Sequence, residues 1–434
     1  MHISIATVFP HLYRDFLDTS LIKRSQENGI VEYDVVGFSS FCEPKVRIDS
    51  PVVGHGSGMA IRPELIEAIV QAQEKKYGSS YKIFLTPQGV KLDQKVAKRL
   101  AQTFQEQQHI MFFAGRYEGI DQRAHEEYAD LELSIGDYIL MGGDLAAMVV
   151  LESVMRYIPG VVAKKDSVEN DSFTGPFVDF PVYATPSAPW KNRIVPEILI
   201  SGNHKLIEDF RKKQAVKRSV VEHFQWVRSY CVDKKDKELV SQAIPYHYVA
   251  LMHDQVIVDQ GKVGTSSVTS LDIHDIARSC ATYGVKHYFL VTPLIDQQKI
   301  ANTILHFWND AGIAYNHNRA EAVSKVSVIA ALDKVIETIE AQIGKKPLLV
   351  ATSAKVGNQA KNITFYDQSI IWSQDRPVLF IFGTAKGLSD ELIKRCDYLL
   401  IPVEGFSEFN HLSVRSAVAV VLDRWMGNNN VIVD

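Results

Sequence analysis

The amino-acid sequence predicts an α/β fold with parallel sheets, built twice along one chain. Apolar runs of strand length alternate with stretches of helical spacing near the N-terminus, and a second series of the same kind begins near Tyr246. This alternation is typical of parallel strands joined by crossover helices. With 434 residues, the chain is also too long to surround a single hydrophobic core. We therefore expect two α/β domains of ordinary size.

The elements expected in the first series follow from the apolar runs and the turn residues around them. Each expected strand runs into glycine or proline, and the first expected helix has Pro63 near its start and Gly78 after its end. The expected strands cover residues 3–9, 81–87 and 109–115, and the expected helices cover residues 62–78 and 91–107.

The middle of the chain changes character twice. Residues 161–196 are rich in loop residues, and residues 198–240 are polar with helical spacing. Within the latter, five of the eight residues from 211 to 218 are basic and none is acidic, which favours contact with a phosphate backbone. These five candidate RNA-binding residues are Arg211, Lys212, Lys213, Lys217 and Arg218.

In the second series, strands are expected at residues 248–258, 286–293, 346–353, 377–384 and 398–403, with a helix at residues 296–312. No residue-level repeat relates this series to the first. We thus expect a first domain at residues 1–165, a catalytic or interdomain loop at 166–197, a helical RNA-binding segment at 198–245 and a second domain at 246–434.

Composition excludes several classes of protein. Hydrophobic residues make up 46% and charged residues 23% of the chain, which is the balance of a globular protein. The net charge of −4 means that a nucleic-acid partner must be held by a local basic patch. The four cysteines form no CxxC or zinc pattern, the histidines have no metal-ligand spacing, and no metal site is predicted. Without a signal peptide or a membrane-length apolar run, a cytoplasmic protein with reduced thiols is expected.

Three glycine-containing loops follow expected strands of the first domain: LTPQG at 85–89, GRYEGID at 115–121 and SIGDYILMGGDLAAM at 134–148. Glycines let a backbone approach a ligand closely, and free backbone groups at the carboxyl ends of strands can bind an adenosine. Taken separately, each loop is equally compatible with a plain turn between a strand and a helix.

Taken together, residues 1–230 resemble the bacterial tRNA (guanine-N1)-methyltransferases of the TrmD family, members of the knotted SPOUT superfamily. The resemblance includes the loops above, the opening strand ending in FP, IPGV at 158–161, DSF at 171–173 and SGNH at 201–204. It implies a trefoil knot, which ordinary folds avoid, and S-adenosylmethionine bound in it. The cofactor-binding residues it implies are Phe84, Leu85, Thr86, Pro87, Gly115, Glu118, Ile135, Gly136, Asp137, Tyr138, Ile139, Leu140, Gly142 and Gly143.

The resemblance also implies the catalytic residues. Guanine N1 carries a proton and becomes a nucleophile only as that proton leaves, so the reaction needs a base. That role falls on Asp171, and Arg156 is expected to stabilise negative charge on guanine O6. By themselves, the residues favour a loop or capping aspartate at Asp171 and a surface salt bridge at Arg156, and only the family context indicates the catalytic roles. The family further implies tRNA as a partner and a homodimer of two copies of the chain, and it suggests Mg²⁺ as a second cofactor. Neither DNA nor a membrane is expected as a partner.

Two segments depart from the family pattern. The glycine-rich GGGPGM segment that helps to admit the guanine is GHGSGM at 54–59, and the usual YTRP is YATP at 183–186. These changes bear on substrate fit and leave an RNA other than tRNA as an alternative target.

The second half resembles SpoU-like SPOUT methyltransferases, and most closely a small family of uncharacterised bacterial RNA methyltransferases. The matching segments are SVTSLDIHDIARSCATYGV at 267–285, FGTAKGLSDE at 382–391, LLIPV at 399–403 and NHLSVRSAVAVVLDR at 410–424. The GTAKG part of the second segment lacks the Gly-Lys-Ser/Thr ending of a phosphate-binding P-loop, so nucleotide hydrolysis is not expected. The implied cofactor residues are Thr352, Gly383, Thr384, Gly387, Ile401, Pro402, Leu412 and Ser413.

Arg278 coincides with the arginine that SpoU enzymes place near the acceptor, which would suit ribose 2′-O-methylation. The alternative is a helix-surface arginine paired with Asp275 or Asp272. A second domain that binds cofactor or RNA, or aids dimerisation, without catalysing a reaction also remains open.

Overall fold

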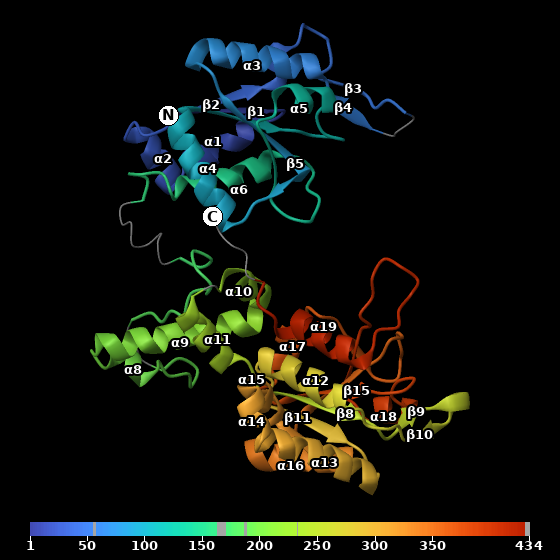
Figure 1. Ribbon diagram of the computed structural model, residues 1–434. Helices are drawn as coiled ribbons and strands as arrows, with labels where there is room; N and C mark the ends of the chain where they lie inside the picture. The colour runs from blue at the N-terminus through green and yellow to red at the C-terminus, as the bar shows by residue number, and fades with distance from the viewer. Residues whose placement is uncertain (55–57, 163–170, 186–188, 232, 430–434) are drawn as a thin grey trace. The chain divides into compact units, whose positions relative to one another are not determined.

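The computed structural model describes residues 1–54, 58–162, 171–185, 189–231 and 233–429. The chain forms two compact units, Met1–Thr174 and Gly175–Asp434. Figure 1 shows a sheet with helices on its faces in each of them. Within the described ranges, no helix has both the length and the apolar character needed to span a bilayer.

The first unit is built on a five-stranded parallel sheet with the order β2-β1-β6-β5-β7. Its strands are β1 His2–Thr7, β2 Glu32–Gly37, β5 Tyr81–Lys91, β6 His109–Ala114 and β7 Leu131–Ser134. The short strands β3 Asp49–Pro51 and β4 Met59–Ile61 form a separate antiparallel pair. Its helices are η1 Pro10–Tyr13, α1 Arg14–Leu17, α2 Ser20–Glu27, η2 Phe38–Phe41, α3 Pro63–Tyr77, α4 Gln94–Gln107, α5 Gln122–Tyr128 and α6 Asp144–Met155.

Helices cover both faces of this sheet, and two hydrophobic clusters result. Side chains of α3 and α5 share one cluster with Phe113, while α2, α4 and α6 share the other with Phe112. Successive strand residues point to opposite faces, so a strand buried on both sides is apolar throughout. All six residues of β6 are accordingly buried.

The expected elements of the first unit are present, and the largest change of boundary lies between β5 and α4. Helix α3 has Pro63 in its first turn and ends at Gly78, which has a φ of +86° that favours glycine. Strand β5 is longer than expected and continues through LTPQG to Lys91. Helix α4 therefore begins at Gln94 instead of residue 91, where the side chain of Asp93 accepts a hydrogen bond from the Val96 amide at 2.8 Å.

The second unit contains a seven-stranded parallel sheet with the order β12-β11-β8-β15-β13-β16-β14. Its strands are β8 His247–Met252, β11 His287–Val291, β12 Val326–Ile329, β13 Leu348–Thr352, β14 Lys361–Ile363, β15 Val378–Gly383 and β16 Tyr398–Leu400. Its helices are α8 Glu197–Ile200, α9 His204–Glu222, α10 Phe224–Tyr230, α11 Lys234–Ala243, η3 Asp259–Gly261, α12 Ser270–Thr282, α13 Ile295–Asn309, α14 Gly312–Tyr315, α15 His317–Val323, α16 Leu332–Ile343, α17 Gln368–Trp372, α18 Asp390–Lys394 and α19 Val414–Met426.

The strand expected at residues 248–258 is divided in the structure. It stops at Met252, and β9 Val256–Ile257 pairs instead with β10 Val263–Gly264 in a small antiparallel ladder. Gln255, between the two strands, has a φ of +54°, so the chain turns there and cannot continue as one extended strand. Strands β12 and β14 lie at the two edges of the sheet and were not among the expected elements.

The two sheets have the same topology. If the five strands of the first sheet are numbered in chain order, they lie in the order 2-1-4-3-5. Strands β8, β11, β13, β15 and β16 of the second sheet lie in the same order, and β12 and β14 extend it at the edges. The repeat is therefore one of topology, which explains why no repeat is detectable residue by residue.

The helical segment before β8 shares a core with the second sheet. Val216 of α9 and Phe224 of α10 belong to the same hydrophobic cluster as the strands. The buried Arg228 guanidinium donates hydrogen bonds to the carbonyl oxygens of Arg424 and Asp423 at 2.7 and 2.8 Å, at the end of α19. The sequence predicts a boundary between this segment and the second domain at residue 245, whereas the structure groups both in one compact unit from Gly175 onward.

His247, the first residue of β8, is a buried polar group in that core. Its Nε2 accepts hydrogen bonds from the indole nitrogens of Trp425 and Trp372 at 3.0 and 3.2 Å, and its Nδ1 donates to the Pro245 carbonyl at 2.6 Å. Nε2 can accept these bonds only in the neutral ring. Burial lowers the pKa of His247 from 6.5 to about 4.

This arrangement predicts acid sensitivity of the second unit. In the unfolded chain His247 becomes protonated below pH 6.5, while in the folded chain it resists protonation down to about pH 4. The contribution of neutral His247 to the free energy of unfolding is thus fully present above pH 6.5 and is lost as the pH falls towards 4. Between pH 7 and pH 5 the free energy of unfolding should fall by about 2 kcal/mol. Denaturant unfolding of wild type and His247→Asn at both pH values measures this, and an equal pH dependence in the two proteins contradicts it.

Candidate functional site

Three loops of the first unit meet at one edge of its sheet. Strands β6, β5 and β7 are neighbours and parallel, so their carboxyl ends lie together. GRYEGID follows β6, SIGDYILMGG follows β7, and LTPQG lies within the last part of β5. The predicted cofactor residues are thereby brought to one place, where parallel α/β sheets commonly bind ligands.

The carboxylate of Asp144 joins these loops to the first strand. Its Oδ2 accepts hydrogen bonds from Nε and Nη2 of Arg116 at 3.1 and 3.0 Å, and its Oδ1 accepts from Thr7 Oγ1 at 2.5 Å. The hydroxyl of Tyr13 donates to the same Oδ1 at 3.3 Å. Burial, followed by the negative charge of Asp144, raises the pKa of Tyr13 and keeps it a donor. Sequence reasoning missed Asp144, Arg116, Thr7 and Tyr13.

The chain after β7 passes closely against the loop after β6. The Gly143 amide donates to the Gly115 carbonyl at 2.8 Å, and Gly142 forms a bridge with Arg116. A Cβ at Gly143 would lie 2.9 Å from Ala114 Cα, which is closer than real Cβ atoms come. Glycine is thus required here by close backbone approach.

The predicted cofactor residues differ in exposure. The ring of Phe84 is fully buried and stacks on Phe113 with ring centroids 4.5 Å apart, so it can offer a ligand only its backbone. Leu85, Ile135 and Leu140 border the core of the sheet and present apolar side chains. The more accessible predicted residues are Pro87, Glu118, Asp137, Tyr138 and Ile139. Asp137 pairs with Lys91 at 2.5 Å.

The two predicted catalytic residues of the first unit lie together. Nη2 of Arg156, at the end of α6, donates a hydrogen bond to Oδ2 of Asp171. Their side chains remain 43% and 30% exposed, so a substrate can reach both. The expected GHGSGM and YATP segments fall partly on residues 55–57 and 186, outside the described residues.

The predicted cofactor residues of the second unit also converge. Strands β15, β13 and β16 are neighbours, and Thr352, Gly383 and Ile401 lie at their carboxyl ends. The Oγ1 of Thr352 donates to the Ile381 carbonyl at 3.0 Å, which ties β13 to β15. Leu412 and Ser413 directly precede α19, and Ser413 caps that helix.

A directed chain of hydrogen bonds supports the loop after β15. Thr384 Oγ1 donates to the Met252 carbonyl at 2.8 Å and accepts from Ser266 Oγ at 2.5 Å. Ser266 Oγ therefore accepts the 3.0 Å hydrogen bond from Nδ1 of the buried His253. Burial lowers the pKa of His253. Neither His253 nor Ser266 was predicted, because residues 253, 266 and 384 are far apart in the sequence.

Arg278 is exposed on α12, and the alternative arrangement, a pairing with Asp275 or Asp272, is absent from the ion pairs of the described residues. Arg415 of α19 takes that place, with its guanidinium 3.2 Å from Asp272 and 3.5 Å from Asp275. Sequence reasoning missed Arg415, although it follows the predicted cofactor residue Ser413 by two positions.

The basic residues of α9 are all exposed. Lys212 pairs with Asp236 at 3.4 Å and Arg218 with Glu222 at 3.1 Å. In the described part of the chain, Arg211, Lys213 and Lys217 form no ion pair within 4 Å, which leaves three cations open to a phosphate backbone. Also within the described residues, no group of three or more His, Cys, Asp or Glu side chains is placed to hold a metal ion.

Comparison with known families divides the chain in the same way as the motifs. Residues 1–228 match the family described as tRNA (guanine-1)-methyltransferase TrmD. Residues 246–427 match a family described as SAM-dependent RNA methyltransferase.

Curated relatives occur with and without the second part. A tRNA (guanine-N(1)-)-methyltransferase of Nitratidesulfovibrio vulgaris is 33% identical over 99% of this chain and 100% of its own length. One of Oleidesulfovibrio alaskensis is 31% identical with the same coverage. One of Anoxybacillus flavithermus is 36% identical over 56% of this chain and 98% of its own length. The chain therefore belongs to the TrmD family of tRNA (guanine-1)-methyltransferases and carries, behind that part, a second domain of a SAM-dependent RNA methyltransferase family.

Proposed function

We propose that the first unit methylates N1 of the guanosine at tRNA position 37, next to the anticodon, with S-adenosylmethionine as methyl donor. The observation that carries the proposal is the Arg156–Asp171 pair, which places a carboxylate and a guanidinium side by side in the unit that holds the three cofactor loops. The name tRNA (guanine-N(1)-)-methyltransferase of the full-length relatives supports the same reaction.

Asp171 and Arg156 have complementary tasks in this proposal. The Asp171 carboxylate accepts the N1 proton of guanine while the N1 lone pair forms the new bond to carbon. Electron density that develops on guanine O6 is met by the Arg156 guanidinium, which is a fixed cation. The pair also keeps both groups in reach of one ring before the substrate arrives. When bound, S-adenosylmethionine supplies the methyl group and leaves as the thioether.

The cofactor loops fit a nucleoside. Leu85, Ile135 and Leu140 provide an apolar surface, and the glycines of GRYEGID and SIGDYILMGG allow the backbone to approach an adenine ring. The close passage of Gly143 against Ala114 supports a trefoil knot in which the chain after β7 is threaded past the loop after β6. Among the described residues, no group of three or more His, Cys, Asp or Glu side chains is placed to hold a magnesium ion, and Mg²⁺ is commonly held by one or two carboxylates together with waters and phosphates.

The active form is proposed to be a homodimer. Apolar side chains lie exposed beside the cofactor loops: Ile139 is 80%, Met141 91% and Leu145 59% exposed. Leu145 and Val149 are one turn apart on α6, so they form a stripe on the outside of that helix. Large exposed apolar side chains grouped in this way are typical of a protein contact. Asp171 of one subunit would then serve the cofactor loops of the other.

The second unit is proposed to transfer a methyl group to a ribose 2′-oxygen of an RNA. Arg278 is exposed on α12, the helix that Arg415 joins to the start of α19 beside Ser413. Because Arg415 pairs with the nearby carboxylates, the Arg278 guanidinium stays available for a phosphate or an acceptor oxygen.

Replacing the proposed base tests the first reaction. Asp171→Asn removes the proton acceptor but keeps the shape, so 1-methylguanosine formation in unmodified tRNA should fall roughly 100-fold or more. Mass spectrometry of tRNA digests measures the product, and calorimetry should show unchanged S-adenosylmethionine affinity. Asp15→Asn, on the exposed helix α1, is the matched control. Full activity of Asp171→Asn would remove Asp171 from this role.

Subunit mixing tests the shared active site. Met141→Glu places a charge on the exposed apolar surface, and sedimentation should show monomers without activity, whereas Val46→Glu, at another exposed position, stays dimeric. Asp171→Asn and Gly143→Val should each be inactive alone. A mixture of the two should regain part of the activity if a site takes Asp171 from one subunit and the loops from the other, while no recovery argues for sites within single subunits.

The second unit can be tested in the same digests. Arg278→Ala should abolish one methylated nucleoside, expected to carry a 2′-O-methyl group, and leave 1-methylguanosine unchanged. Lys299→Ala, an exposed change on α13, should affect neither product. If only 1-methylguanosine appears with wild type on a panel of RNAs, the second unit is a binding module and not an enzyme.

A further inference from the structure

We propose that a shallow cavity between residues 180–185 and helices α8 and α9 binds one unpaired base of the tRNA. The inference rests on the proposed function in that it takes tRNA as the ligand. It concerns neither the cofactor loops nor the Arg156–Asp171 pair, because the cavity is formed wholly within the second unit.

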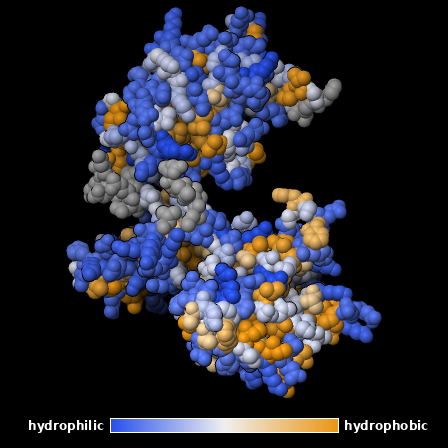
Figure 2. Space-filling view, viewed as in Figure 1, coloured by the Kyte–Doolittle hydropathy of each residue, from blue (hydrophilic) through white to orange (hydrophobic). Residues whose placement is uncertain are grey.

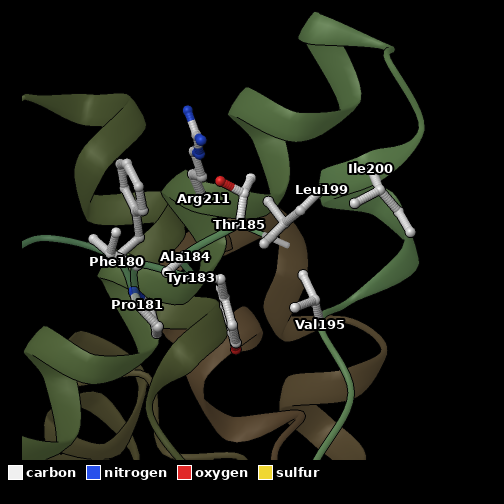
Figure 3. A pocket seen from close by; sticks show the side chains of 10 residues that line it. Phe180, Pro181, Tyr183, Ala184, Thr185, Val195, Leu199, Ile200 and Arg211 are labelled. Carbon is white, nitrogen blue, oxygen red and sulfur yellow. The ribbon is translucent and has the colours of Figure 1, made fainter. Parts of the chain in front are cut away.

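The cavity has the size of a single ring system. Its volume is 140 Å³, and Phe180, Tyr183, Val195, Leu199, Ile200 and Arg211 are among its lining residues. Figure 3 shows side chains of the loop and of both helices around it, with the Arg211 side chain extending away from Tyr183 and Val195. A cavity of about 150 Å³ holds one benzene-sized ring, so a flat base fits better than a folded segment of protein.

The lining residues have the chemistry that binds unstacked bases. Tyr183 is 45% exposed and lines the cavity, where its ring can present a face to a base. The Arg211 guanidinium lies over the Phe180 ring, 4.7 Å from its centroid, and is thus held beside the cavity. Aromatic rings and guanidinium planes are the surfaces on which RNA-binding proteins stack single-stranded bases.

The surroundings combine exposed apolar groups with unpaired cations. Val182 is 85%, Trp190 65% and Ile200 61% exposed, and Figure 2 shows hydrophobic patches within the hydrophilic surface around α8 and α9. Arg211 belongs to the basic stretch of α9, in which Lys213 and Lys217 also form no ion pair among the described residues. A purely apolar protein segment would leave these cations unmatched, whereas an RNA supplies both a base for the cavity and phosphates for the helix.

The test is a double-mutant cycle between the cavity and the RNA, with the full-length protein. Tyr183→Ala should weaken binding of unmodified tRNA roughly 5- to 150-fold, the range measured for loss of one stacked base, and Tyr183→Phe should bind like wild type. A set of tRNAs, each with an abasic nucleotide at a different unpaired position, then locates the base. At one position, the abasic change and Tyr183→Ala together should cost no more affinity than either alone.

Three outcomes would overturn the proposal: losses that multiply at every position, unchanged affinity of Tyr183→Ala, or a change in its oligomeric state that accounts for the weaker binding. The last would make the cavity a contact between subunits. Formation of 1-methylguanosine by wild type at saturating tRNA reports the proposed function separately. If Tyr183→Ala and one abasic position are coupled but no 1-methylguanosine forms, the base-binding cavity is supported and the proposed reaction is rejected. If 1-methylguanosine forms but no position is coupled to Tyr183→Ala, the reaction is supported and the base-binding cavity is rejected.

Discussion

The buried carboxylate of Asp144 is the constraint on which the first site depends. It binds Thr7 at the end of β1, Tyr13 in η1 and Arg116 in the loop after β6, while its own backbone begins α6. A buried charge that loses a partner costs roughly 3–5 kcal/mol. None of the four segments, the end of β1, η1, the loop after β6 and the start of α6, can therefore move away from the others without a large loss of stability. The loops that bring Gly115 and Gly143 together are thus held before any ligand binds. Preorganisation of this kind lowers the cost of ordering a site.

In the second unit, different residues hold the loops of the predicted cofactor site in place. Its sheet repeats the strand order of the first, yet its loop after β15 is supported by the neutral chain from His253 through Ser266 to Thr384 instead of an ion pair. In both units the carboxyl ends of three adjacent strands are brought together because a parallel sheet with crossover connections places them at one edge. The topology therefore positions the loops, and the side chains that hold them are free to differ.

Most of the fold could be predicted from the sequence because periodicity and turn residues are local signals. Pro63 and Gly78 bracket α3, and the apolar run before Gly115 is a buried strand. The candidate site was predictable where motifs are continuous, as in GRYEGID, and for Asp171 and Arg156 only through resemblance to a family. Asp144 had a weak signal, since it follows two glycines at the start of a helix. Thr7 and Ser266 had none, because their partners lie far away in the chain, and Arg415 had only its place beside Ser413 in the motif at 410–424.

The sequence by itself determined the α/β class, the two series of elements, the family of each half and the basic stretch of α9, since each depends on spacing along the chain. Only the tertiary structure decided that both sheets share one strand order, that α9 and α10 belong to the core of the second unit, and that Arg415 displaces Arg278 from the carboxylates of α12. The cavity beside Tyr183 also exists only after folding. The physical reason is that burial, ion pairing and cavity shape depend on which distant segments pack together, and local propensity contains no record of that.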